Sequence, residues 1–339
     1  MDCLHLHKAA VTALQFVPVS ISMLAHSKSK HILASASTDS SIQLIDVSLL
    51  SSLSTSSLSS LPISTLQGHE GEITCLTSSP DGTLLVSGGR DHTIRLWSLL
   101  TNKCLRFVED PGNANSKHKG SITSLHFRGD ELISAGMDGC VKCFRVGATQ
   151  SPRDEEACLS LDALLNWGAE DASEPRVEDK LEWSVTLLPS SGIAQCAFSA
   201  ATDRVLVSSD DREVAVFDAS FAHCLLSLQS PNGEITSIRL DRQCHLLVGS
   251  DDHTILVYDT ATDALLARLP QPTAVSAMAA SGNWIVTPGE AYRLRVLNDR
   301  GEESYSLVGH TGRVTSVAMN ATTIVSCGYD VRVVCVRDG

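Results

Sequence analysis

The sequence predicts an all-β protein in which seven similar four-stranded units form one domain over residues 1–339. Three observations support this prediction. A short motif, in which a β-branched residue is followed by a small residue, occurs seven times, and a turn follows each copy. Apolar and polar residues then alternate, which is typical of half-buried strands. The motif begins at Val11, Ile73, Ile122, Ile193, Ile235, Val275 and Val314.

The spacing of the turns identifies the repeating unit. The distances between successive turns are 52, 47, 73, 41, 39 and 39 residues. The undecorated unit is therefore about 40 residues long, which is the length of one four-stranded propeller blade. No helical unit fits the alternating pattern. The turns end at Asp39, Asp91, Asp138, Asp211, Asp252, Ala291 and Asp330.

The second unit contains Gly68-His69, Ser87, Asp91 and Trp97-Ser98. This set resembles the signature of the WD-repeat (WD40) family, with Ser98 in place of the final Asp. The resemblance covers nearly the whole chain and implies a seven-bladed β-propeller. It also implies a hydrogen-bonded set within each blade, and a buried Asp needs such donors. We therefore assign a structural role, and no catalytic role, to His69, Ser87, Asp91, Trp97, His118, Ser134, Asp138, His310, Ser326 and Asp330.

The other units carry less of the signature. Units one, four, five and six lack the Gly-His pair at the expected place, and unit six has Glu290-Ala291 where Asp is usual. We expect apolar packing to hold these blades. The chain ends soon after the third strand of the last unit, so the alternating segment Cys3 to His7 should pair there and close the ring. His5 and His7 are assigned to packing rather than to a metal.

Three insertions should all lie on the face of the disc opposite the Asp turns. They are residues 17–31, 48–64 and 147–180. Residues 48–64 form a serine-rich linker. Residues 147–180 carry nine acids and three bases. A helix should begin at Ser151-Pro152, because a hydroxyl cap precedes Pro at the first helical position. This acidic, partly helical insertion in blade three either packs on its own blade or docks on a partner through Leu161, Leu164 and Trp167.

Composition and motifs exclude several functions. Asp and Glu number 39 against 26 Lys and Arg, which disfavours direct binding to nucleic acid or to an anionic membrane. The eleven cysteines show no disulfide framework, so we expect a cytoplasmic or nuclear protein. Cys140 and Cys143 should point to opposite faces of a strand and bind no zinc. The sequence contains no phosphate-binding loop, dinucleotide fingerprint, nucleophile elbow or zinc-protease motif, so we predict no cofactor and no enzyme activity.

The resemblance to the WD-repeat family also implies a function. Most members are non-catalytic scaffolds for protein interactions within multiprotein complexes, so we expect other protein subunits as partners. The alternative is a substrate-recognition module, or an enzyme whose site lies at the mouth of the central channel. Purification from native cells distinguishes the two, because only a scaffold subunit must come in a fixed stoichiometric assembly.

In this family partners bind on the top face, which carries the Asp turns and the connections entering each first strand. The binding residues are those just before the turn Asp and those just before the first strand. The acidic residues among them should attract a Lys- or Arg-rich segment of a partner protein. The alternative is that these charges only form a solvated rim. The candidates are the acidic Asp210, Glu234, Asp251 and Glu290, the basic Arg90 and Arg313, and the apolar Met137 and Tyr329.

Overall fold

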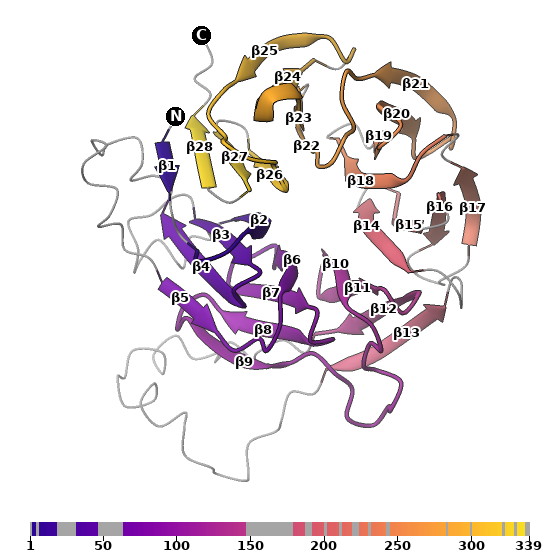
Figure 1. The fold of residues 1–339 in the computed structure, drawn as a ribbon. Coiled ribbons are helices and arrows are strands. Elements are labelled where there is room, and N and C mark those ends of the chain that lie inside the picture. Colours follow the sequence, from indigo (N-terminus) through magenta and orange to yellow (C-terminus); the bar gives the residue numbers. More distant parts are fainter. Residues whose placement is uncertain are drawn as a thin grey trace.

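The described residues form seven four-stranded antiparallel sheets, placed around a central axis as the blades of a propeller (Figure 1). The predicted all-β propeller is confirmed. No helix among these residues is long and apolar enough to cross a membrane. The computed structural model describes residues 2–4, 7–18, 32–46, 64–146, 179–186, 192–199, 202–209, 212–218, 224–229, 232–241, 245–282, 284–298, 300–320, 323–328 and 331–335.

Each blade is a meander whose first strand lies nearest the axis and whose last strand lies at the rim (Figure 1). Blade 1 consists of β2 (Val11–Val17), β3 (Ile32–Ser37), β4 (Ser41–Asp46) and β5 (Ser64–Gln67). Blade 2 consists of β6 (Ile73–Ser78), β7 (Leu84–Gly89), β8 (Ile94–Ser98) and β9 (Lys103–Phe107). Blade 3 consists of β10 (Ile122–Arg128), β11 (Glu131–Gly136), β12 (Cys140–Arg145) and β13 (Lys180–Thr186).

The second half of the chain repeats this arrangement. Blade 4 consists of β14 (Ile193–Ser199), β15 (Arg204–Ser209), β16 (Glu213–Asp218) and β17 (Cys224–Gln229). Blade 5 consists of β18 (Ile235–Leu240), β19 (His245–Ser250), β20 (Thr254–Asp259) and β21 (Leu265–Pro270). Blade 6 consists of β22 (Ala279–Ser281), β23 (Trp284–Pro288), the 3₁₀ turn η4 (Glu290–Tyr292), β24 (Leu294–Leu297) and β25 (Glu303–Leu307).

Blade 7 combines both ends of the chain. It consists of β26 (Ser316–Met319), β27 (Thr323–Cys327), β28 (Val331–Cys335) and the N-terminal β1 (Asp2–Leu4). β1 runs antiparallel to β28, with Asp2 opposite Val333. Of the predicted Cys3–His7 segment, Cys3 and Leu4 lie in β1, whereas His7 lies outside the strand and binds side chains of blade 1.

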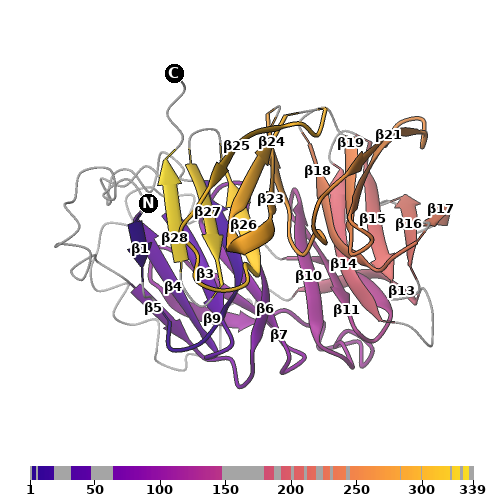
Figure 2. The ribbon, with the colours of Figure 1, turned by 45° about the horizontal axis from the view of Figure 1, so that its top comes forward.

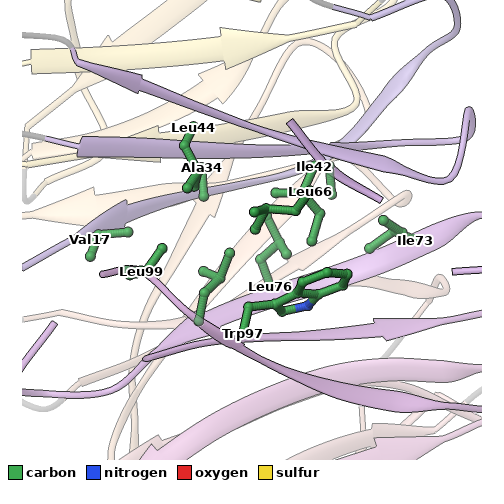
Figure 3. Close-up of a cluster of buried hydrophobic side chains, with 11 residues drawn as sticks. Val17, Ala34, Ile42, Leu44, Leu66, Ile73, Leu76, Trp97 and Leu99 are labelled. Atoms are coloured by element: carbon green, nitrogen blue, oxygen red, sulfur yellow. The ribbon is translucent and has the colours of Figure 1, made fainter. Parts of the chain in front are cut away.

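The hydrophobic core lies between neighbouring blades rather than inside any one blade. The second strands are almost wholly buried, whereas the rim strand β9 is largely exposed. In Figure 3 the Trp97 indole of blade 2 lies beside Leu66 and Ile42 of blade 1 within one buried cluster. Figure 2 shows why such clusters form, since the twisted sheets stand face to face around the ring. Each sheet therefore buries both faces by contact with its two neighbours.

The three predicted insertions fall largely outside the described residues, and so do Leu161, Leu164 and Trp167. The strands that flank them all end on the face opposite the Asp turns, because successive strands alternate in direction. The predicted boundaries need a correction at three places, since Val17, Ser64 and Lys180 each belong to a strand.

Asp179 corrects the sequence interpretation of the acidic insertion. We expected it to be one more acid of that stretch, yet it is buried, and Arg106 of β9 binds it with two N–H groups at 2.7 and 3.0 Å. This pair joins the rim strand of blade 2 to the start of β13. A buried carboxylate needs such a cationic partner, so Asp179 has a structural role.

Candidate functional site

A directed chain of hydrogen bonds crosses blade 2. The buried Trp97 Nε1 donates to Ser87 Oγ at 2.8 Å, and Ser87 Oγ lies 2.7 Å from His69 Nε2. His69 Nδ1 lies 2.7 Å from Asp91 Oδ2. A neutral imidazole carries one N–H, and the carboxylate can only accept. Nδ1 therefore donates to Asp91, and the Ser87 hydroxyl donates to Nε2.

The contact between histidine and a strand serine recurs in blades 3, 7 and 1. His118 lies 2.8 Å from Ser134 Oγ and 2.9 Å from Asp138 Oδ1. His310 lies 2.6 Å from Ser326 Oγ, while Asp330 and Tyr329 are outside the described residues. These contacts agree with the structural role predicted for the set, which no comparison with other proteins tests.

Blade 1 contains a network that the sequence interpretation missed. His7 Nε2 lies 2.9 Å from Ser35 Oγ, and His7 Nδ1 lies 3.3 Å from Asp39 Oδ2. His7 is therefore neither a residue of the closing strand nor a simple packing residue. The signal was available in the spacing, because each network histidine stands four residues before the start of its repeated motif. The four pairs of histidine and motif start are His7 and Val11, His69 and Ile73, His118 and Ile122, and His310 and Val314.

Burial and hydrogen bonding set the ionisation of these networks. Burial lowers the pKa of His69 and outweighs the contact with Asp91, so the imidazole is neutral near pH 7. Burial raises the pKa of Asp138, but hydrogen bonds and the charge of His118 outweigh it and hold the pKa at about 2. Ser87 is fully buried, and both His69 and Trp97 bind its hydroxyl, so this oxygen is not open to a substrate. These contacts agree with a structural role for the set in blade 2.

Blade 6 replaces this network with a different one. Gln271 stands four residues before Val275, where the other blades have histidine, and Arg295 Nη1 donates to its Oε1 at 2.5 Å. Arg295 Nε donates to Glu303 Oε2 at 2.6 Å. Thr287 occupies the serine position, and its buried hydroxyl has no hydrogen-bond partner among the described residues. This polar network adds to the apolar packing that we expected to hold the blade.

The small residue of the repeated motif joins neighbouring blades. It lies at a β-bulge at the start of the first strand in blades 1 to 5. A bulge turns a side chain away from the regular pleat. The hydroxyl then donates to the carbonyl oxygen of the next blade, as Thr12 does to Ile73, Thr74 to Ile122 and Thr236 to Val275. Thr315 donates to Val11 at 2.6 Å and so links blade 7 to blade 1.

The two classes of predicted top-face residue are brought together in the structure. A backbone hydrogen bond joins the residue before the turn Asp to the residue before the first strand. The backbone N–H of the residue before the turn Asp donates to the carbonyl oxygen of the residue before the first strand. The pairs are Thr38 to Ala10, Arg90 to Glu72, Met137 to Ser121 and Asp251 to Glu234. Asp210 is outside the described residues. The pairs therefore form a ring of adjacent positions on the top face.

The acids and bases of this ring differ in their partners. Arg90 Nε lies 3.0 Å from Glu72 Oε2, and Lys117 Nζ lies 2.8 Å from Glu109 Oε2. Glu234, Asp251 and Glu290 are exposed, and no Lys, Arg or His among the described residues forms an ion pair with them. We call these three residues the acidic arc. Arg313 and Met137 are also exposed on this face.

Comparisons with known proteins agree with the repeat and the networks. The model of the family described as "WD domain, G-beta repeat" matches residues 60–98, 112–145 and 222–259. The first two matches contain the His69 and His118 networks.

Several curated proteins align with longer parts of the chain. Telomerase protein component 1 of Rattus norvegicus is 27% identical over 290 residues, which is 78% of this chain. WD repeat-containing protein 18 of Mus musculus is 29% identical over 192 residues, and F-box/WD repeat-containing protein 9 of Bos taurus is 24% identical over 206 residues. The chain spans 11% of the length of the first and 38% of each of the other two. The repeat motif, the blade networks and these matches together show that the chain belongs to the WD-repeat family.

Proposed function

We propose that this protein is a non-catalytic scaffold subunit of a multiprotein complex, and that its acidic arc binds a Lys- or Arg-rich segment of a partner. One observation carries the proposal. The exposed acids of blades 5 and 6 have no cationic partner within the described part of the chain, whereas Arg90 of blade 2 is bound to Glu72. Unpaired charges on one side of a face attract a partner of opposite charge and orient it.

The backbone holds the arc ready for binding. Glu234 N donates to Asp251 Oδ1 at 2.6 Å, while Asp251 N donates to Glu234 O at 3.1 Å. The first bond fixes the Asp251 carboxylate and the second joins the two backbones, so the Asp251 side chain loses little freedom when a partner binds. Asp251 Oδ2 and the Glu234 carboxylate make no hydrogen bond within the described part of the chain and can accept from ammonium or guanidinium groups. Charge-assisted hydrogen bonds of this kind are about twice as strong as neutral ones.

Charge reversal tests the arc. We would change Asp251 and Glu290 to Lys and measure binding of a labelled Lys- and Arg-rich peptide by fluorescence anisotropy. The matched control reverses Asp130 and Glu302, which are exposed at the opposite face and produce the same change in net charge. Binding should fall in the first variant only, and it should weaken as salt increases. Equal loss in both variants would show attraction by net charge alone and would contradict the arc.

A second proposed contact is the insertion of residues 147–180, where Leu161, Leu164 and Trp167 would dock on a partner subunit. Its test is deletion of residues 150–178 with a short Gly-Ser link, followed by purification from native cells. A lost partner with an unchanged melting temperature supports docking. A lower melting temperature with the partner retained shows instead that the insertion packs on its own blade.

A further inference from the structure

One layer of residues on the first strands surrounds the axis of the propeller. Each member stands four residues after the first residue of the repeated motif. On the second strand of its blade it pairs with the residue that stands five positions before the residue ending the turn. Strand register therefore defines this layer, and none of its members belongs to the top-face residues described above. Its members are Gln15, Thr77, His126, Ala197, Arg239, Ala279 and Ala318.

Arg239 carries a charge that the layer does not balance. Its Nη1 donates to Ile238 O at 2.7 Å and lies 3.5 Å from Gln195 Oε1. No carboxylate of the described residues forms an ion pair with it, and the layer positions on either side are Ala197 and Ala279, which have no side-chain acceptor. Burial lowers the pKa of Arg239, and no acid opposes this effect. A partly buried cation without an anion is unfavourable for the fold.

His126 adds a second nitrogen-bearing group to this region. Its Nε2 lies 2.7 Å from the carbonyl oxygen of Cys196, so Nε2 carries the hydrogen and donates. Nδ1 has no hydrogen-bond partner within the described ranges. Burial, together with the charge of Arg239, lowers the pKa of His126 to about 4. His126 is therefore neutral near pH 7, and its pKa responds to the charge of Arg239.

We propose that Arg239 binds an oxyanion, either a phosphate or a carboxylate, beside the first strands of blades 4 and 5, where His126 of blade 3 also reaches β14. The Nε and Nη2 groups of Arg239 make no hydrogen bond within the described part of the chain, so they are available to the ligand. Guanidinium presents N–H groups in a planar fork that matches two oxygens of such an anion. A bound anion would neutralise Arg239 and raise the proton affinity of His126. This site is separate from the acidic arc and takes a ligand of opposite charge.

Inorganic phosphate is the first probe, at millimolar concentration and constant ionic strength. It should raise the melting temperature of the full chain, because a ligand that binds only the folded state stabilises it. In Arg239→Gln its affinity should fall about tenfold or more, since a charge-assisted contact is lost. Arg268→Gln, which removes an exposed arginine from β21, should respond as the wild type does. Equal responses of the wild type and Arg239→Gln would overturn the proposal.

Two further measurements complete the test. If Arg239→Gln does not fold, nuclear magnetic resonance of His126 in the wild type decides, because phosphate should move its pKa upward and an unchanged pKa overturns the site. A short Glu-rich peptide distinguishes the sources of the anion. Competition between this peptide and phosphate assigns a protein carboxylate as a ligand, whereas binding of phosphate alone assigns a free anion.

Discussion

Ser87→Ala should destabilise the protein strongly, because one buried hydroxyl serves two partners. Ser87 is fully buried, accepts from Trp97 Nε1 at 2.8 Å and lies 2.7 Å from His69 Nε2. The alanine variant leaves the Trp97 N–H and the His69 acceptor without partners. Each buried group left unsatisfied costs about 1 to 3 kcal/mol, so the loss of two should lower the free energy of unfolding by about 2 to 6 kcal/mol. Whole domains are stable by only about 5 to 15 kcal/mol.

Thr287→Val provides a control of opposite sign. Thr287 occupies the equivalent position in blade 6, since it pairs with Arg295 as Ser87 pairs with Arg95. Its buried hydroxyl has no partner among the described residues, so replacing it with a methyl group of similar shape should leave stability unchanged or raise it. Urea unfolding, with the slope of each curve compared, measures both variants. Equal losses for Ser87→Ala and Thr287→Val would refute the hydrogen-bond argument.

Three other perturbations follow from the structure. Asp138→Asn should lower the free energy of unfolding at pH 7 and flatten its dependence on pH. The pKa of Asp138 is about 2 in the folded protein against an ordinary value of 3.8, so the carboxylate stabilises the fold above pH 4 and this stabilisation is lost as the pH falls toward 2. Urea midpoints of both proteins between pH 2 and 7 measure the difference. Thr315→Val should lower the melting temperature by weakening the junction of blades 7 and 1, and Thr262→Val, at a rim loop, should have little effect. Asp179→Asn should lower the free energy of unfolding, measured with a chemical denaturant, by about 3 to 5 kcal/mol, because it removes the carboxylate that pairs with Arg106. The double variant Asp179→Leu/Arg106→Met should recover part of this loss.

The repeat, the strand class and the turn positions could be predicted from the sequence because they depend on local patterns. Alternation of apolar residues marks strands wherever they lie in the chain, and about 40 residues between turns leave room for one four-stranded unit. The networks of His69 and His118 could be predicted because their histidine, serine and aspartate recur at fixed spacings. His7 has the same spacing from Val11, but the alternating pattern of Cys3 to His7 assigned it to the closing strand.

The tertiary structure alone decided which distant groups meet. Asp179 looks like any residue of an acidic stretch, and only the approach of β9 to β13 places Arg106 against it. Thr315 and Val11 lie at opposite ends of the chain and bond because the ring returns to its start. Arg239 has no carboxylate partner among the described residues, and the strand register sets alanines at the equivalent positions of the neighbouring blades. Local sequence fixes the strand and its period, whereas contacts across the ring depend on how seven twisted sheets pack, which no short segment encodes.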